Sequence, residues 1–340
     1  MLKKIHVEQA VGLTLGHDMT RVIPGKCKEV AFPRGHIITK EDIPILLSMG
    51  KEHVFITEGQ DGEVHEEVAA RRLAEAFAGS EFNRSGVKEG RINLVSTTNG
   101  VFKVDLPLLS QINSVDGVVL ATRHNNTVCH PGMVLAGTKI IPLYMPEADL
   151  RKVEDLCKKQ DQVLRVIPFK LKKVGVVVTG SEVYKGLIQD KFTDTIKHKA
   201  EELGAHIEHS VVVPDDENMI AGAILDMKAR GCEIIFACGG FSVDPDDVTV
   251  EGVEQTGAEI IAYGAPVMPG SMCLVAYLDG VPILGAPACA IWNKATVIEV
   301  FFPRMLAGDR ITRNEVAELG HGGLCLNCEP CVYPLCPFCK

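Results

Sequence analysis

Short runs of consecutive apolar residues alternate with amphipathic segments through the second half of the chain. The runs at 174–178 and 233–238 show no polar alternation, as strands that are buried on both faces require. Helices are predicted at about 192–203 and 217–229. Strands that alternate with helices of this length indicate βαβ units, and therefore an α/β fold with a mostly parallel sheet flanked by helices. The same pattern predicts further strands at 206–213, 258–263 and 272–284 and further helices at 247–256 and 289–306.

The first half of the chain has a mixed α+β pattern. Helices are predicted at 41–49, where Thr39 and Asp42 indicate a capping box, and at 63–78 and 147–164. Strand-like runs are predicted at 51–57, 91–96, 118–122 and 138–143. We therefore expect three regions: a mixed α+β region at 1–165, an α/β domain at 166–310 and a cysteine-rich tail at 311–340.

Composition narrows the classes of function. Hydrophobic residues make up 46% of the 340 residues, and the formal net charge is −9 without a lysine- or arginine-rich stripe. This acidic balance argues against nucleic acid as the main partner. No apolar run reaches the length of a membrane span, and the first residues lack an apolar signal region, so we expect a cytoplasmic protein without membrane association.

Glycines and small polar residues gather where three predicted strands end, at residues 179–182, 239–247 and 285–288. In open parallel sheets, ligands bind beyond the C-terminal ends of the strands, and the helix N-termini that follow attract anions. Each end could be a plain turn, but the agreement of three ends favours a binding cleft. The residues alone thus predict a site for an anionic, phosphate-bearing ligand without naming it.

A run of acidic residues follows the second of these strand ends. Asp244, Asp246 and Asp247 are of the type that hold Mg²⁺, which prefers one or two carboxylates together with phosphate oxygens of a ligand. The alternative is that these aspartates only cap the next helix.

Five motifs connect the strand ends to a known family. They are Thr179-Gly180-x-Glu182, Ile188-x-Asp190, Gly239-Gly240-x-Ser242 with Asp247, Pro269-Gly270 and Gly285-x-Pro287. With them, residues 171–306 resemble the molybdopterin-binding domain shared by molybdopterin molybdotransferases and molybdopterin adenylyltransferases. The N-terminal part resembles that of the molybdotransferases more weakly, through Phe32-x-Arg34-Gly35 and Leu46-x-x-Met49-Gly50.

The resemblance implies a ligand and a set of residues that bind it. The ligand would be molybdopterin or its adenylylated nucleotide form. Asp190 and Asp247 would be the catalytic carboxylates, and Asp246 and Asp247, together with Asp190, would place Mg²⁺. The remaining cofactor-binding positions are Thr179, Gly180, Glu182, Gly239, Gly240, Ser242, Pro269, Gly270, Gly285 and Pro287. The resemblance also implies a homodimer.

Several positions depart from the enzyme pattern. Ser181 and Asp244 stand where the pattern has Asp and Gly, and Ser271 stands where it has Lys, so a cation that could steady molybdate or phosphate charge is missing. The Leu-Pro-Gly-Asn-Pro turn reads Ala-Pro-Ala-Cys-Ala at 286–290, which places Cys289 near the cleft, either as a core residue or as a thiol beside a metal-dithiolene.

Two main hypotheses of function follow. The first is a protein of molybdenum cofactor biosynthesis or maturation, including a transferase that inserts molybdate. The second is a non-catalytic carrier or sensor that delivers the cofactor to an apo-molybdoenzyme, and Ser181 and Ser271 favour it. A third, pyridine-nucleotide processing on a related fold, is disfavoured because no second catalytic domain is evident.

The end of the chain carries a separate signal. Five of the twelve cysteines lie in the last 16 residues: Cys325, Cys328, Cys331, Cys336 and Cys339. This spacing misses the bacterial ferredoxin run by one residue, which indicates an iron–sulfur cluster. It also allows Zn²⁺ between the pairs Cys325/Cys328 and Cys336/Cys339, with Cys331 left over. The alternatives are a reduced, disordered tail or disulfides formed after oxidation, and a reducing compartment disfavours disulfides.

Overall fold

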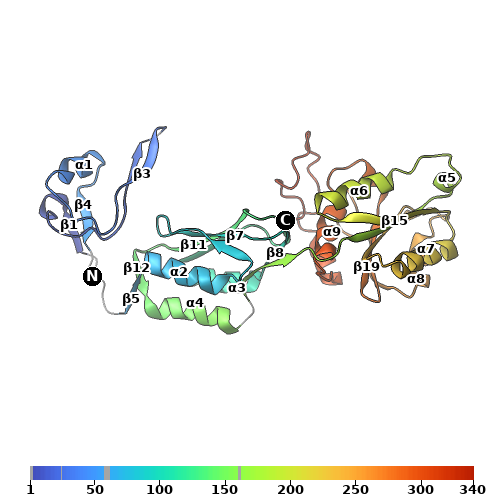
Figure 1. Ribbon diagram of the computed structural model, residues 1–340, viewed down its shortest axis with the longest axis horizontal. Helices are drawn as coiled ribbons and strands as arrows, with labels where there is room; N and C mark the ends of the chain where they lie inside the picture. The colour runs from blue at the N-terminus through green and yellow to red at the C-terminus, as the bar shows by residue number, and fades with distance from the viewer. Residues whose placement is uncertain (1–2, 24, 57–61, 160–161) are drawn as a thin grey trace. The chain divides into compact units, whose positions relative to one another are not determined.

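The computed structural model describes residues 3–23, 25–56, 62–159 and 162–340 (Figure 1). The chain divides into two compact units. The first unit comprises Met1–Thr97, Val104–Arg123 and Pro131–Arg165, and the second comprises Thr98–Lys103, His124–His130 and Val166–Lys340. No helix among the described residues is long and apolar enough to cross a membrane.

The first unit combines small antiparallel sheets with helices, as the mixed α+β pattern predicted. Its largest sheet has the strand order β6-β7-β11-β9, and the pairs β1-β4, β2-β3 and β5-β12 form separate ladders. Its elements are β1 (Lys3–His6), η1 (Val7–Gln9), β2 (Met19–Ile23), β3 (Cys27–Phe32), α1 (Asp42–Ser48), β4 (His53–Ile56), β5 (Glu63–His65), α2 (Glu66–Phe77), β6 (Phe82–Arg84), β7 (Ile92–Ser96), α3 (Leu106–Asn113), β9 (Val118–Thr122), β11 (Val134–Ile140), β12 (Tyr144–Pro146) and α4 (Glu147–Lys159).

The second unit is built on a six-stranded sheet. Its elements are β14 (Lys173–Thr179), α5 (Ser181–Tyr184), α6 (Phe192–Glu202), β15 (His206–Val213), α7 (Glu217–Ala229), β16 (Ile234–Cys238), α8 (Thr249–Gln255), β17 (Glu259–Tyr263), β18 (Leu274–Leu278), β19 (Val281–Ala286), η2 (Ala288–Ile291), α9 (Ile298–Leu306) and α10 (Arg313–Glu318). A three-stranded sheet, lying mainly in this unit, joins β10 (Thr127–Cys129), β8 (Gly100–Val104) and β13 (Leu164–Pro168).

The strand order of the large sheet is β15-β14-β16-β19-β18-β17. The first four strands run parallel to one another. Strand β18 is antiparallel to β19, and β17 is antiparallel to β18. This order confirms the predicted α/β class. It also places the C-terminal ends of β14, β16 and β19 next to one another, although they are far apart in the sequence.

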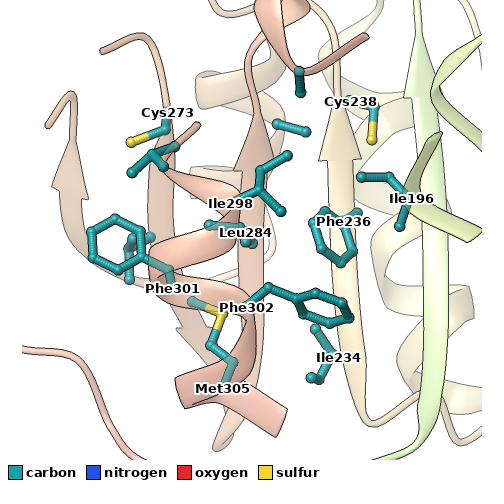
Figure 2. Packing of buried hydrophobic residues seen from close by; sticks show 14 of the residues in the cluster. Ile196, Ile234, Phe236, Cys238, Cys273, Leu284, Ile298, Phe301, Phe302 and Met305 are labelled. Atoms are coloured by element: carbon teal, nitrogen blue, oxygen red, sulfur yellow. The ribbon is translucent and has the colours of Figure 1, made fainter. Parts of the chain in front are cut away.

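Helices cover both faces of this sheet, which explains why β14 and β16 lack polar alternation. On one face, side chains of α6 and α9 pack on alternate strand residues, and on the other face α7 and α8 do the same. Figure 2 shows the first of these cores, in which Phe302 of α9 meets Phe236 of β16 edge to face at 5.0 Å. Both rings are fully buried, so replacing either one with alanine should cost about 3–5 kcal/mol of stability.

Two predictions for the second unit were wrong in detail. The run 272–284 forms two strands, β18 and β19, because Asp279 and Gly280 both adopt positive φ and make a two-residue hairpin turn. The predicted helix 289–306 is divided into η2 and α9. Thr296 lies between the two helices, and its hydroxyl accepts a hydrogen bond from the Ile298 N–H at 3.2 Å, at the first residue of α9.

Other predictions need correction outside the sheet. The helix predicted at 63–78 begins only at Glu66, because 63–65 pair with β12. Among the described residues, three α-helices were not predicted: α3, α5 and α10. The carboxylate of Asp105 caps α3 by accepting from the Leu108 N–H, and Thr312 opens α10 with a capping box. Residue 57 of the strand predicted at 51–57, and residues 160–161 of the helix predicted at 147–164, lie outside the described residues.

Candidate functional site

A cleft of about 450 Å³ opens at the C-terminal ends of β16 and β19. It is lined by Gly239, Gly240, Phe241, Ser242, Asp247, Met268, Pro269, Gly270, Ser271, Met272, Ala286, Pro287, Ala288 and Cys289. Seven of the positions predicted to bind or act on a ligand therefore come together in one space: Gly239, Gly240, Ser242, Asp247, Pro269, Gly270 and Pro287. Sequence reasoning missed Phe241, Met268 and Met272, which give no polar or glycine signal.

The glycine turn after β16 is shaped by two buried threonines. Gly240 has a φ of +65°, and a Cβ atom there would lie 2.2 Å from Oγ1 of Thr249. A Cβ atom on Gly239 would lie 2.6 Å from the carbonyl oxygen of Thr179. The hydroxyls of Thr179 and Thr249 are 3.0 Å apart and buried. Thr179 therefore packs beneath the turn and does not line the cleft. Thr249 was not among the site residues predicted from the sequence.

Asp247 is the one charged residue among the residues that line the cleft, which include no lysine or arginine. Its Oδ2 accepts a hydrogen bond from the backbone N–H of Ser242 at 2.6 Å, which closes the loop between them. Asp244 similarly accepts from the N–H of Asp246 at 3.0 Å, and Asp246 is exposed. Asp244 and Asp247 therefore accept hydrogen bonds from backbone groups of their own loop. Asp247 also lines the cleft.

The other predicted positions are not among the residues that line the cleft. Asp190 accepts hydrogen bonds from the N–H groups of Phe192 and Thr193 at 2.7 and 3.2 Å, so it caps the first turn of α6. Glu182 is exposed on α5, and Gly180 is the residue that precedes that helix.

Gly285 lies under the cleft floor. A Cβ atom on it would be 2.6 Å from the ring of Phe241, so glycine is required there for packing.

Comparison with known proteins agrees with this geometry. Residues 175–307 match the family described as the probable molybdopterin binding domain. The match covers the α/β domain of the second unit and not the rest of the chain. Residues 4–58 match a domain of unknown function, so the N-terminal resemblance to the molybdotransferases stays a prediction.

The relatives cover only part of the chain. CinA-like proteins of Mycobacterium tuberculosis and Mycobacterium bovis are 32% identical over 90 residues, which are 26% of this chain and 21% of theirs. The chain therefore spans about a fifth of the length of these relatives. Among solved structures, the tungsten cofactor synthesizing protein MoaB of Pyrococcus furiosus has a TM-score of 0.32 and 18% identity, covering 36% of this chain and 87% of its own. CinA of Thermoplasma acidophilum, of unknown function, has a TM-score of 0.30 and 18% identity, covering 35% and 90%.

No ready-made metal site is present in the described part of the chain. Nowhere in it are three or more His, Cys, Asp or Glu side chains placed together as a metal ion requires. In the molybdopterin-binding domain, Asp190, Asp246 and Asp247 therefore do not converge on one point, and their expected joint role in placing Mg²⁺ is not seen.

The cysteine tail packs against the molybdopterin-binding domain. Phe338 is buried in the core beside α9, and the Tyr333 hydroxyl donates to the carbonyl oxygen of Glu299 at 3.4 Å. All five tail cysteines are free thiols and half-buried. Burial, together with the neighbouring Cys336 and Cys325, raises the pKa of Cys339 to about 12.

Cys289 lines the cleft of the molybdopterin-binding domain as a half-buried thiol. Burial raises its pKa above the ordinary 9.0, and the charge of Glu299 adds to this. The thiol is therefore protonated at neutral pH. Cys289 behaves as an apolar wall residue beside Met268 and Met272, and not as a thiolate.

Proposed function

We propose that the cleft binds molybdopterin or its adenylylated form, and that the protein acts in the biosynthesis or maturation of the molybdenum cofactor. The observation that carries this proposal is the convergence of the family's glycine, serine and proline motifs on one cleft within the matching domain. Its volume of about 450 Å³ lies in the range of sites that enclose a small organic ligand.

The lining divides into two kinds of surface for such a ligand. Met268, Met272 and Cys289 offer polarisable, apolar contacts that suit a flat ring and sulfur atoms. Ser242 and Ser271 offer hydroxyls for polar groups of the ligand. We propose that the pterin ring packs on the sulfur-containing side and that the phosphate lies toward the glycine turn.

Mg²⁺ is proposed as the partner of the ligand's phosphate. The lining residues include no lysine or arginine, so the protein supplies no side-chain cation there. Asp247, with Asp246 beside it, offers the one or two carboxylates that Mg²⁺ uses when phosphate oxygens and water complete its shell. The ion would therefore bind with the ligand rather than before it.

A non-catalytic carrier is the second candidate function, and the same lining favours it. Transfer of molybdate or of a nucleotide develops negative charge that a transferase must stabilise, and no basic side chain lines this cleft. The carboxylates of Asp190 and Asp247 both accept backbone N–H groups, which suits positioning better than proton transfer. A carrier would hold the cofactor and release it to an apo-molybdoenzyme.

The binding test uses one substitution inside the cleft and one outside it. Ala288→Glu adds a negative charge at an exposed cleft residue, and Ala229→Glu adds the same charge at an exposed position of α7. The full chain would be mixed anaerobically with molybdopterin and Mg²⁺ and gel-filtered, and the retained pterin would be oxidised to its fluorescent product. We expect retention by the wild type and by Ala229→Glu, and at least about a tenfold weaker affinity for Ala288→Glu.

Equal retention by both variants would place the pterin elsewhere, and no retention by the wild type would refute the proposed ligand. Gly240→Asp is a poorer probe, because its side chain would collide with Thr249 and disturb the turn itself. Consumption of adenylylated pterin in the presence of Mg²⁺ and molybdate would identify an enzyme. Its unchanged recovery would identify a carrier.

Two further expectations stay proposals. A homodimer and a cytoplasmic location are supported by the family resemblance alone. A zinc ion or iron–sulfur cluster in the tail is supported by the five closely spaced cysteines.

A further inference from the structure

The single tryptophan of the chain, Trp292, lies on the surface of the second unit. It is 85% exposed, although folding usually buries most of a tryptophan side chain. It directly follows η2, the 3₁₀ helix that contributes Ala288 and Cys289 to the lining of the cleft.

Other apolar side chains at this cleft are exposed as well. Met268 and Met272 line it, and Val243 comes directly after the lining residue Ser242. These three apolar residues are 36–92% exposed. A single exposed apolar residue needs no explanation, but several at one cleft are typical of a surface that a ligand covers. Trp292 is the largest side chain of this kind.

The geometry of η2 places Trp292 on the cleft side. Its N–H donates to the carbonyl oxygen of Cys289 at 3.1 Å, which is the hydrogen bond of a 3₁₀ helix. Side chains three residues apart eclipse one another in such a helix. Trp292 therefore lies on the same face as Cys289, about 6 Å farther along the axis. Ala290, on a different face, is buried in the core.

The backbone that carries the indole ring is held in place without a ligand. The carbonyl oxygen of Cys289 also accepts from the backbone N–H of Asn293 at 2.9 Å and from its side-chain amide at 3.0 Å. Three donors thus fix this turn. Only the side-chain torsions of Trp292 remain to be ordered on binding, which keeps the entropic cost of a contact small.

We infer that Trp292 stacks on the pterin ring of the ligand and extends the sulfur-containing side of the cleft outward. This inference rests on the proposed function, in which the pterin packs beside Met268, Met272 and Cys289. An indole face offers a large, flat contact for a heteroaromatic ring. Stacking does not need a charged group, so it suits a lining that includes no lysine or arginine.

The assignment predicts which forms of the ligand depend on Trp292. Molybdopterin and its adenylylated form carry the same pterin, so a residue that stacks on this ring supports both of them equally. A residue that stacked on the purine would support only the adenylylated form. The ratio of the two affinities therefore separates recognition of the pterin from recognition of the nucleotide.

The test compares Trp292→Leu, which keeps apolar bulk, with Trp292→Phe, which keeps an aromatic ring. Both variants should fold, because the residue is exposed. The full chain and both variants would be titrated anaerobically, with Mg²⁺, against molybdopterin and against its adenylylated form. Retained pterin would be measured after gel filtration. We expect Trp292→Leu to bind both forms about fivefold to tenfold more weakly, and Trp292→Phe to lose less than about threefold.

The fluorescence of the wild type gives a second readout, because its single tryptophan reports on this position alone. We expect molybdopterin to quench it saturably, in parallel with retention, whereas free N-acetyltryptophanamide should show no saturation. Unchanged binding by Trp292→Leu would overturn the inference and leave the proposed function intact. Loss confined to the adenylylated form would overturn the pterin assignment in favour of the purine. Failure of the wild type to bind either form would refute the proposed function and this inference together.

Discussion

Replacing Arg304 with methionine tests how the molybdopterin-binding domain is held to helix α10. The Arg304 side chain is 3% exposed, and it donates to Asp309 and to Glu315, each at 2.6 Å. Removing one partner of a buried ion pair costs about 3–5 kcal/mol, because the remaining charges lose their compensation. Asp309 keeps Lys103 at 2.9 Å, and Glu315 keeps the backbone N–H of Thr312, so we expect the lower end, about 3 kcal/mol.

Urea unfolding, with hydrogen exchange of the α9 and α10 peptides, would measure this loss. Arg230→Met is the control, because Arg230 pairs with Asp226 on an exposed helix surface and should cost less than about 1 kcal/mol. Equal losses in the two variants would refute the reasoning.

The same network predicts a dependence on pH. Burial alone would raise the pKa of Asp309, but Arg304 and Lys103 outweigh it and hold the pKa below the ordinary 3.8. A lowered folded pKa means that the stabilisation is complete above the unfolded value and disappears as the pH falls through the folded value. The difference between wild type and Arg304→Met should therefore shrink below about pH 4. A constant difference down to pH 2 would contradict the assigned ion pairs.

Three other outcomes are expected. Gly240→Ala should destabilise the domain by about 2–3 kcal/mol in urea unfolding, because it combines positive φ with a collision. The cost should fall in a Thr249→Ala background, and an additive cycle would show that the collision is not the cause. Alkylation of Cys289 by iodoacetamide, followed by mass spectrometry, should speed up only as the pH passes above 9.0, and rapid labelling at pH 7 would contradict its raised pKa. Thr312→Ala removes the cap of α10 and should cost about 1 kcal/mol by thermal unfolding, whereas Thr312→Ser should cost little.

The apolar runs and helix periods of residues 171–306 were enough to predict the α/β class, because strands buried on both faces need continuous apolar sequence. The glycine motifs also gave the strand ends where the cleft opens. Local sequence patterns predicted helix boundaries less well where a single capping residue determines where a helix begins. The helix predicted at 289–306 is divided into η2 and α9, and Thr312 caps α10, which apolar periodicity did not show.

Only the tertiary structure decided which motif residues face the cleft. Thr179 and Gly285 follow the family pattern, yet both lie beneath the floor, because neighbouring strands and Phe241 cover them. Asp190, which was predicted to act at the site, accepts backbone N–H groups at the first turn of α6 and is not among the lining residues. Spacing along a chain fixes which groups can meet, but packing between distant segments fixes which of them do.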